Sequence, residues 1–85
     1  MSTFTTTVKA IVAKIPAGST MTYKQVALAA GNPKAARAVA NIMAANFDPR
    51  VPCHRVLRSD GALGGYNRGG VVAKAALLRA EGVVL

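Results

Sequence analysis

Residues 22–40 read TYKQVALAAGNPKAARAVA, and this stretch carries the signals of two short helices separated by a tight turn. Thr22 is a suitable N-cap for the first helix because Gln25 follows three residues later, which is the spacing of a capping box. Gly31 predicts the end of that helix, because glycine is the usual residue just after a helix C-terminus. The stretch therefore predicts two adjacent helices in the central part of the fold.

The second helix of this stretch should run from about Pro33 to about Ala45. Asn32 is a favoured N-cap residue, and proline is favoured at the first helical position. Val26 and Leu28 are expected to help anchor the preceding helix. Two helices joined in this way predict a helix-turn-helix unit. An ordinary αα-hairpin is the more common alternative, and the basic charge of the chain favours the DNA-binding unit.

The second helix is rich in small and basic side chains. Lys34 and Arg37 stand among the alanines at positions 35, 36, 38 and 40. A small-residue face lets the helix backbone come close to another helix or to a DNA groove.

Further elements are predicted on both sides of this unit. An N-terminal helix is indicated by apolar residues at helical spacing, which are Phe4, Val8, Ile11, Val12 and Ile15. Residues 16–18, which are Pro-Ala-Gly, end it. Residues 54–57 are a candidate short strand, and residues 59–61 are a turn.

The C-terminal part combines a glycine-rich loop with a last helix. Residues 64–70 form the loop, and the helix is expected from about Val71 to Glu81. Val72, Leu77 and Leu78 are expected to face inward, and Gly82 to end the helix.

The composition indicates one small basic domain. The chain has 85 residues, which we expect to form a single domain over residues 1–85, with 52% hydrophobic but only 5% aromatic residues. Eleven Lys and Arg against three Asp and Glu give a net charge of +8 and a pI near 10.7. Such a domain attracts polyanions, so nucleic acid is the leading partner. Charge that serves only solubility is the alternative.

Other partners and compartments are less favoured. No long apolar run or signal peptide is present, so we expect no membrane association and a cytoplasmic protein located with the DNA, in a nucleoid or a nucleus. The chain is expected to be a monomer. One Cys and one His provide neither a disulfide nor a structural zinc site, and no metal or cofactor is expected.

The single cysteine lies in the segment Pro52-Cys53-His54-Arg55-Val56. Pro52 restricts the backbone before Cys53. A thiol near positive groups such as His54 and Arg55 loses its proton more easily, and the thiolate is the nucleophile. In a regular strand adjacent side chains point to opposite faces, so a direct Cys–His bond needs a turn here or a bridging water.

This segment and several others together resemble the O6-alkylguanine-DNA alkyltransferases. The further matching pieces are Ile15-Pro16-Ala17-Gly18, Thr22-Tyr23, Gly31 to Val39, Asn46, Ser59-Asp60-Gly61, Gly64-Gly65-Tyr66, Lys74, Leu77-Leu78 and Glu81-Gly82. They follow one another in order over nearly the whole chain. The resemblance implies a mainly α, winged-helix-like domain with a helix-turn-helix, a short strand or wing and a C-terminal helix.

The resemblance also implies how the chain binds DNA. The recognition helix enters the minor groove of double-stranded DNA, and an O6-alkylated guanine is flipped out of the stack. Arg37 fills the gap, and Tyr23 presses on the phosphate beside the target. Ala35, Ala36 and Ala40 are the small residues that let the helix approach, with Lys34 beside them in the DNA-binding set.

The catalytic roles implied by the resemblance centre on Cys53, which accepts the alkyl group. His54, through a water, and Glu81 form the thiolate, while Asn46 lies at the hinge before the active-site loop. Tyr66 protonates the leaving guanine. The substrate pocket is expected to include Pro49, Gly64, Gly65 and Asn67. The product is a stable thioether, so each molecule works once.

Each role has a simpler alternative. Cys53 could be an inert core thiol, His54 a structural histidine, Glu81 an ordinary final-turn residue, Tyr23 a core residue and Arg37 a solvated charge. A carboxylate is poorly placed near a helix C-terminus, which favours a specific partner for Glu81.

The chain also departs from the family pattern. Residues 46–53 are one residue shorter than usual and residues 66–74 are one longer, and we expect the chain to lack the domain that often precedes this one in full-length members. Two other functions remain open: an alkyltransferase-like protein, a group that lacks the acceptor cysteine and binds without transfer, and a plain helix-turn-helix regulator.

Overall fold

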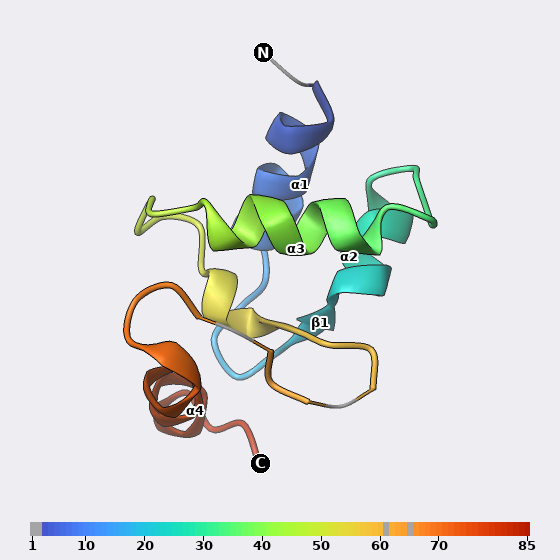
Figure 1. Ribbon diagram of the computed structural model, residues 1–85. Helices are drawn as coiled ribbons and strands as arrows, with labels where there is room; N and C mark the ends of the chain where they lie inside the picture. The colour runs from blue at the N-terminus through green and yellow to red at the C-terminus, as the bar shows by residue number, and fades with distance from the viewer. Residues whose placement is uncertain (1–2, 61, 65) are drawn as a thin grey trace.

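Residues 3–60, 62–64 and 66–85 are described by the computed structural model in Figure 1. Its elements are α1 (Thr3–Ala13), β1 (Met21–Thr22), α2 (Tyr23–Ala29), α3 (Ala36–Ala44), the 3-10 helix η1 (Cys53–Arg55), β2 (Val56–Leu57) and α4 (Gly70–Ala80). The expected mainly α domain with a helix-turn-helix, a short strand and a C-terminal helix is confirmed. No helix in the described ranges is long and apolar enough to cross a membrane.

The N-terminal cap of α2 is the capping box predicted from the sequence. Thr22 Oγ1 accepts a hydrogen bond from the Gln25 backbone N–H at 3.0 Å, and Gln25 Oε1 accepts one from the Thr22 N–H at 2.8 Å. Two otherwise free backbone donors are thereby satisfied. Gly31 follows the helix with φ of +85°, as its predicted place after the C-terminus requires.

The start of α3 differs from the prediction. The helix begins at Ala36, with Ala35 as an N-cap that provides no side-chain hydrogen bond, rather than at Pro33 after an Asn32 cap. The Asn32 N–H instead donates to Ala27 O at 3.0 Å, and the Gly31 N–H donates to Leu28 O at 3.0 Å. These two bonds close a Schellman motif at the end of α2. Asn32 therefore belongs to the C-terminal cap of α2, and the new helix starts later.

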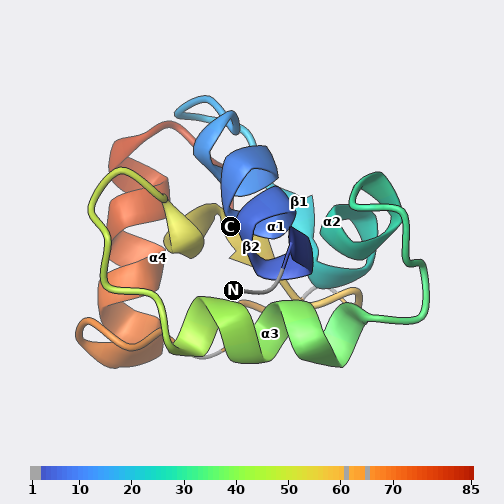
Figure 2. The ribbon, with the colours of Figure 1, turned by 90° about the horizontal axis from the view of Figure 1, so that it is seen from above.

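The core lies where α1, α2 and α3 meet the segment from Val51 to Val56. Its buried members are Val8, Val12, Ile15, Val26, Ala27, Val39, Met43, Val51, Cys53 and Val56. Figure 2 shows α1 over the middle of the molecule, with α2 and α4 on opposite sides and α3 along one edge. Val26 anchors α2 as expected, whereas the expectation for Leu28 is wrong because that side chain is 62% exposed.

The candidate strand at residues 54–57 is only half strand. Residues 53–55 turn as η1, and Val56–Leu57 pairs in parallel with Met21–Thr22, in the register Met21 to Val56 and Thr22 to Leu57. Figure 1 shows η1 between α3 and α4. Because the backbone turns here, Cys53 and His54 are not fixed on opposite faces as they would be in a regular strand.

The C-terminal helix buries a different face from the one predicted. Leu78 is fully buried as expected, but its neighbours on the inner face are Lys74 and Ala75. Val72 is 79% exposed and Leu77 is 40% exposed, so both expectations are wrong. The helical period explains this, because Val72 precedes Leu78 by six residues and cannot share its face. Gly82, with φ of +92°, follows the end of the helix as predicted.

Candidate functional site

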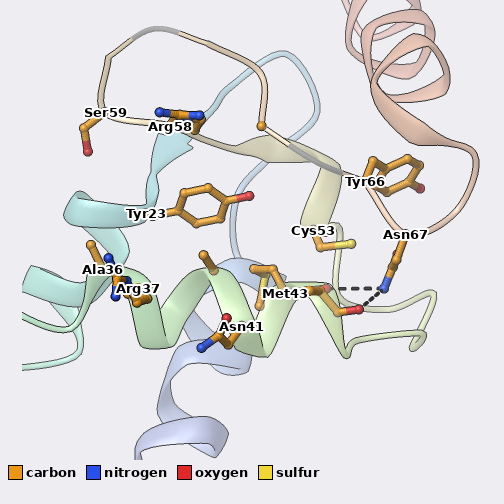
Figure 3. A pocket seen from close by; sticks show the side chains of 13 residues that line it. Tyr23, Ala36, Arg37, Asn41, Met43, Cys53, Arg58, Ser59, Tyr66 and Asn67 are labelled. Carbon is orange, nitrogen blue, oxygen red and sulfur yellow. Dashed lines mark hydrogen bonds between the residues drawn. The ribbon is translucent and has the colours of Figure 1, made fainter.

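Cys53 lies at the wall of a cavity of about 740 Å³ between α3 and the segment that follows β2. Figure 3 shows Tyr23 and Tyr66 on either side of this space, with α3 beneath it. The lining residues are Tyr23, Ala36, Arg37, Ala40, Asn41, Met43, Ala44, Cys53, Arg58, Ser59, Gly64, Tyr66 and Asn67. We call this space the main cavity.

The face of α3 toward the main cavity contains three of the six predicted DNA-binding residues. Ala36, Arg37 and Ala40 all line it, which follows from their helical spacing. Lys34 is exposed in the turn before the helix and does not line the cavity, and Ala35 packs against the core at the helix start. The two alanines leave the helix backbone open to close approach, and Arg37 adds an exposed cation.

Tyr23 lies half-buried on the opposite side of the main cavity. A Cβ atom on Gly64 would lie 3.3 Å from the Tyr23 hydroxyl oxygen and equally close to Arg58 Cγ, and Gly64 has φ of +76°. Position 64 therefore requires glycine both for its conformation and for space. Burial raises the pKa of Tyr23, and the negative charge of an ionised Cys53 adds to the effect.

Cys53 is 6% exposed and is the first residue of η1. Its backbone N–H donates to Val51 O at 2.8 Å, and Figure 3 shows its sulfur directed toward the side where Tyr66 and Asn67 lie. Burial, together with the charge of an ionised Cys53, raises the pKa of Tyr66. The phenol therefore keeps its proton at neutral pH and lies near the sulfur.

Behind Cys53, His54 contacts the end of α4. Its Nε2 lies 2.9 Å from Glu81 Oε2, and both side chains are mostly buried. A carboxylate can only accept a hydrogen bond, so Nε2 carries the proton and Nδ1 of a neutral ring is left as an acceptor. No hydrogen bond joins Cys53 to the His54 ring among the described residues.

Arg55 is a site residue whose partner the sequence did not reveal. Its Nε donates to Glu81 Oε1 at 2.9 Å, its Nη2 donates to Oε2 at 2.7 Å, and its Nη1 donates to Ile15 O at 2.7 Å. These hydrogen bonds from Arg55 are the main reason that the pKa of Glu81 is lowered to about 2, with His54 adding to the effect. Glu81 is therefore held as a carboxylate facing His54.

Asn46 and Asn67 join the active-site loop to the end of α3. Asn46 is buried, with Nδ2 donating to Val51 O at 3.2 Å and Oδ1 accepting from the Asp48 N–H at 3.3 Å. Asn67 Nδ2 donates to Asn46 O at 2.7 Å and to Ala44 O at 2.8 Å. The two amides hold the segment before Cys53 and the segment after Tyr66 against the same helix end.

Lys74 is a second residue whose place the sequence did not predict. It is fully buried on α4, and its Nζ donates to Val56 O at 2.8 Å. Burial lowers its pKa to about 8, and the charge of an ionised Cys53 opposes that shift. The ammonium also lies 5.9 Å from the centre of the Tyr23 ring. A buried amine thus lies between the Tyr23 ring and the backbone of β2.

The remaining predicted pocket residues lie elsewhere. Pro49 lines a second cavity of about 330 Å³, which shares Cys53 and Tyr66 with the main cavity. Gly65 falls outside the described residues. Within the described ranges, no three His, Cys, Asp or Glu side chains gather in a way that could hold a metal ion.

Comparisons with known proteins agree on one family. A family model described as the DNA-binding domain of 6-O-methylguanine DNA methyltransferase matches residues 3–83. The methylated-DNA–protein-cysteine methyltransferase of Mus musculus is 55% identical over 67 residues, which are 78% of this chain and 32% of that protein. The chain thus spans about a third of the length of this curated relative.

Two solved structures superpose closely. Mycobacterium tuberculosis OGT in complex with DNA gives a TM-score of 0.89 at 40% identity, covering 96% of this chain and 50% of that chain. S. pombe Atl1, in complex with damaged DNA containing O6-carboxymethylguanine, gives a TM-score of 0.87 at 32% identity. The alignment with Atl1 covers 99% of this chain and 80% of that chain.

Proposed function

Because this chain belongs to the 6-O-methylguanine DNA methyltransferase family through its DNA-binding domain, we propose that it repairs O6-alkylguanine in double-stranded DNA. In this proposal the damaged base leaves the stack, enters the main cavity and gives its alkyl group to Cys53. Residues 1–85 act as a single unit in it. The observation that carries the proposal is the position of Cys53 in one cavity with Arg37 and Tyr66.

We assign base extrusion to one end of the main cavity and alkyl transfer to the other. Arg37 lies on the α3 face, where its planar cation can enter the space that the flipped base leaves and stack on neighbouring bases. Ala36 and Ala40 let the helix approach the groove closely. Cys53 and Tyr66 lie deeper, where the base arrives. Base extrusion and transfer are thus assigned to different residues of one cavity.

The transfer step is a displacement at carbon. The Cys53 thiolate forms a carbon–sulfur bond to the alkyl carbon, and the bond between that carbon and O6 breaks with its electron pair left on guanine. The thiol proton passes through a water to His54 Nδ1, and the Tyr66 phenol donates a proton to the departing base. Tyr66 then regains a proton from solvent and His54 releases one, so the net change moves the thiol proton to guanine. Glu81 acts as a positioning residue that keeps the His54 proton on Nε2.

The thioether that forms is stable, so each molecule transfers once and no cofactor takes part. Binding to alkylated DNA without transfer is the second candidate function. The similarity to S. pombe Atl1 over most of both chains favours it, whereas the presence of Cys53 in the main cavity favours transfer.

A nucleoside assay separates the two functions. Duplex DNA with one O6-methylguanine is incubated with equimolar protein and digested, and the nucleosides are quantified. Transfer predicts conversion of O6-methyldeoxyguanosine to deoxyguanosine up to one equivalent, and none with Cys53→Ala. Retained O6-methyldeoxyguanosine together with tight binding of the damaged duplex would establish the binding function and overturn transfer.

A further inference from the structure

The second cavity has a chemistry that the proposed transfer of a methyl group does not use. It has a volume of about 330 Å³, and its lining includes Pro49, Leu77 and several cationic side chains. Cys53 and Tyr66 lie on the boundary between it and the main cavity. We call it the side cavity. A group held in the side cavity would therefore lie next to Cys53.

The cations that line the side cavity are Arg50, Arg55 and Arg68, with His54 beside them, and no Asp or Glu is among its lining residues in the described ranges. Arg50 is paired with Asp48 at 3.0 Å, and Arg55 is paired with Glu81. Arg68 forms no ion pair within residues 3–60, 62–64 and 66–85. Its charge is therefore the one available to an anionic ligand in this cavity.

Arg68 is held close to Tyr66 by a tight turn. The Gly70 N–H donates to Tyr66 O at 3.0 Å, which closes the turn around Arg68. Gly69 has φ of +123°, and a Cβ there would lie 2.9 Å from the Ala73 Cβ, so the turn requires glycine. Arg68 and Tyr66 both line the side cavity, and the Arg68 charge lowers the pKa of Tyr66 against the larger effect of burial.

The geometry of displacement directs the rest of the alkyl group toward the side cavity. Sulfur, attacked carbon and O6 must lie nearly in line, so a substituent on that carbon extends sideways from the line. With the base in the main cavity and Cys53 on the boundary, the space beside the sulfur is the side cavity. A methyl group leaves this space unused, and a longer group enters it.

We propose that the side cavity selects O6-alkyl groups that end in a carboxylate, such as carboxymethyl, and that Arg68 is the residue that binds the carboxylate. This inference rests on the proposed function. A carboxylate and a guanidinium form charge-assisted hydrogen bonds of matching geometry. In the step itself Cys53 forms a bond to the methylene carbon and O6 leaves with the electron pair, giving S-carboxymethylcysteine and guanine.

Three duplexes that differ only at the alkyl group test the inference. One carries O6-carboxymethylguanine, one its neutral carbamoylmethyl isostere and one O6-methylguanine, and single-turnover rates are measured for each. The decisive quantity is the carboxymethyl rate divided by the carbamoylmethyl rate. Effects of Arg68 on DNA phosphates or on Tyr66 act on both substrates and cancel in this ratio.

The variants are Arg68→Gln, Arg68→Lys and, as a matched control, Arg79→Gln, an exposed arginine of α4 that lines neither cavity. The ratio should fall roughly fivefold in Arg68→Gln, as expected for a partly exposed ion pair. It should be largely kept in Arg68→Lys and unchanged in Arg79→Gln. An equal ratio in wild type and Arg68→Gln, with methyl transfer intact, would overturn the side-cavity inference and leave the proposed function standing.

Binding provides a second readout that does not depend on transfer. With Cys53→Ala, the affinity for the carboxymethyl duplex relative to the carbamoylmethyl duplex should be higher than in the double variant that also carries Arg68→Gln. Equal relative affinities in Cys53→Ala and in the double variant would contradict the inference. If wild-type protein transfers none of the three groups while Cys53→Ala still shows the preference, the proposed transfer fails and the anion preference of the cavity holds.

Discussion

Nε2 of His54 lies 2.9 Å from Oε2 of Glu81, a residue 27 positions later in the chain. The same carboxylate accepts two hydrogen bonds from Arg55, which keeps it ionised. A fixed carboxylate on one ring nitrogen leaves the other nitrogen free to take a proton. The residue that follows the end of α4 thereby fixes the proton position on the ring of the residue after Cys53.

Substituting Glu81 tests that arrangement in the transfer reaction. Glu81→Gln removes the negative charge and lets an amide N–H face the ring, so the proton is no longer held on Nε2. We expect single-turnover methyl transfer at neutral pH to slow by roughly tenfold or more, with the helical circular dichroism unchanged. Arg79→Gln, at an exposed arginine of α4 that lines neither cavity, is the control and should transfer at the wild-type rate. Equal rates for Glu81→Gln and wild type would reduce Glu81 to a helix-end residue.

The same carboxylate makes stability depend on acid. The pKa of Glu81 is lowered from 4.5 to about 2 in the folded chain, so the unfolded state binds more protons between these values. The stabilisation is present above pH 4.5 and is lost as the pH falls toward 2. Between pH 4.5 and 3 we expect wild type to lose about 1–2 kcal/mol more than Glu81→Gln, measured by urea unfolding. Parallel pH profiles for the two proteins would contradict the pairing of Glu81 with Arg55.

Lys74 makes stability depend on pH in the alkaline range. Burial lowers its pKa from 10.5 to about 8, so folding disfavours its charged form. The folded state releases this proton first, and stability should rise as the pH goes from 8 toward 10.5. Between pH 8 and 9.5 we expect wild type to gain up to about 2 kcal/mol relative to Lys74→Met, which does not titrate there. A constant difference between the two proteins over this window would show that Lys74 is not buried as an amine.

Arg37 separates extrusion of the base from chemistry. Opening the duplex leaves a gap in the stack that costs a few kcal/mol, and a planar cation in the gap offsets part of it. Arg37→Ala should slow repair of O6-methylguanine in duplex DNA by roughly tenfold or more while leaving reaction with free O6-benzylguanine nearly unchanged. Both rates are measured on one preparation. A common fall in the two rates would mean that Arg37 supports the fold or the cavity instead.

Local signals in the sequence predicted the local parts of the fold. The capping box of Thr22 and Gln25 depends on residues three apart, and the structure confirms it. The predicted Asn32 N-cap is wrong because α3 begins only at Ala36, while the Asn32 N–H closes the end of α2 by donating to Ala27 O. A local motif cannot show which of two helix ends a residue joins. The parallel pairing of β1 with β2 is also a tertiary contact, and strands of two residues are too short to be predicted from the sequence.

For the site, too, the sequence predicted the local features and missed the contacts between distant residues. The motif around Cys53 identified the cysteine, the histidine and their neighbours, because those residues are contiguous. The bidentate pairing of Arg55 with Glu81 and the burial of Lys74 join residues 18 or more positions apart. Alternating small and apolar residues on α4 gave no sign that its buried face would hold an amine. Such partners follow from packing, which a single sequence does not display.

The central claim is that Cys53 is the acceptor, and intact mass spectrometry tests it most directly. Protein is mixed with excess duplex containing O6-methylguanine, and its mass and the mass of its Cys53 peptide are recorded over time. The account predicts a gain of one methyl group in exchange for one proton, located on Cys53, reaching one per molecule and then stopping. Cys53→Ala should gain nothing and still bind the duplex. A wild-type protein that remains unmodified in excess substrate, or is modified at another residue, would contradict the account.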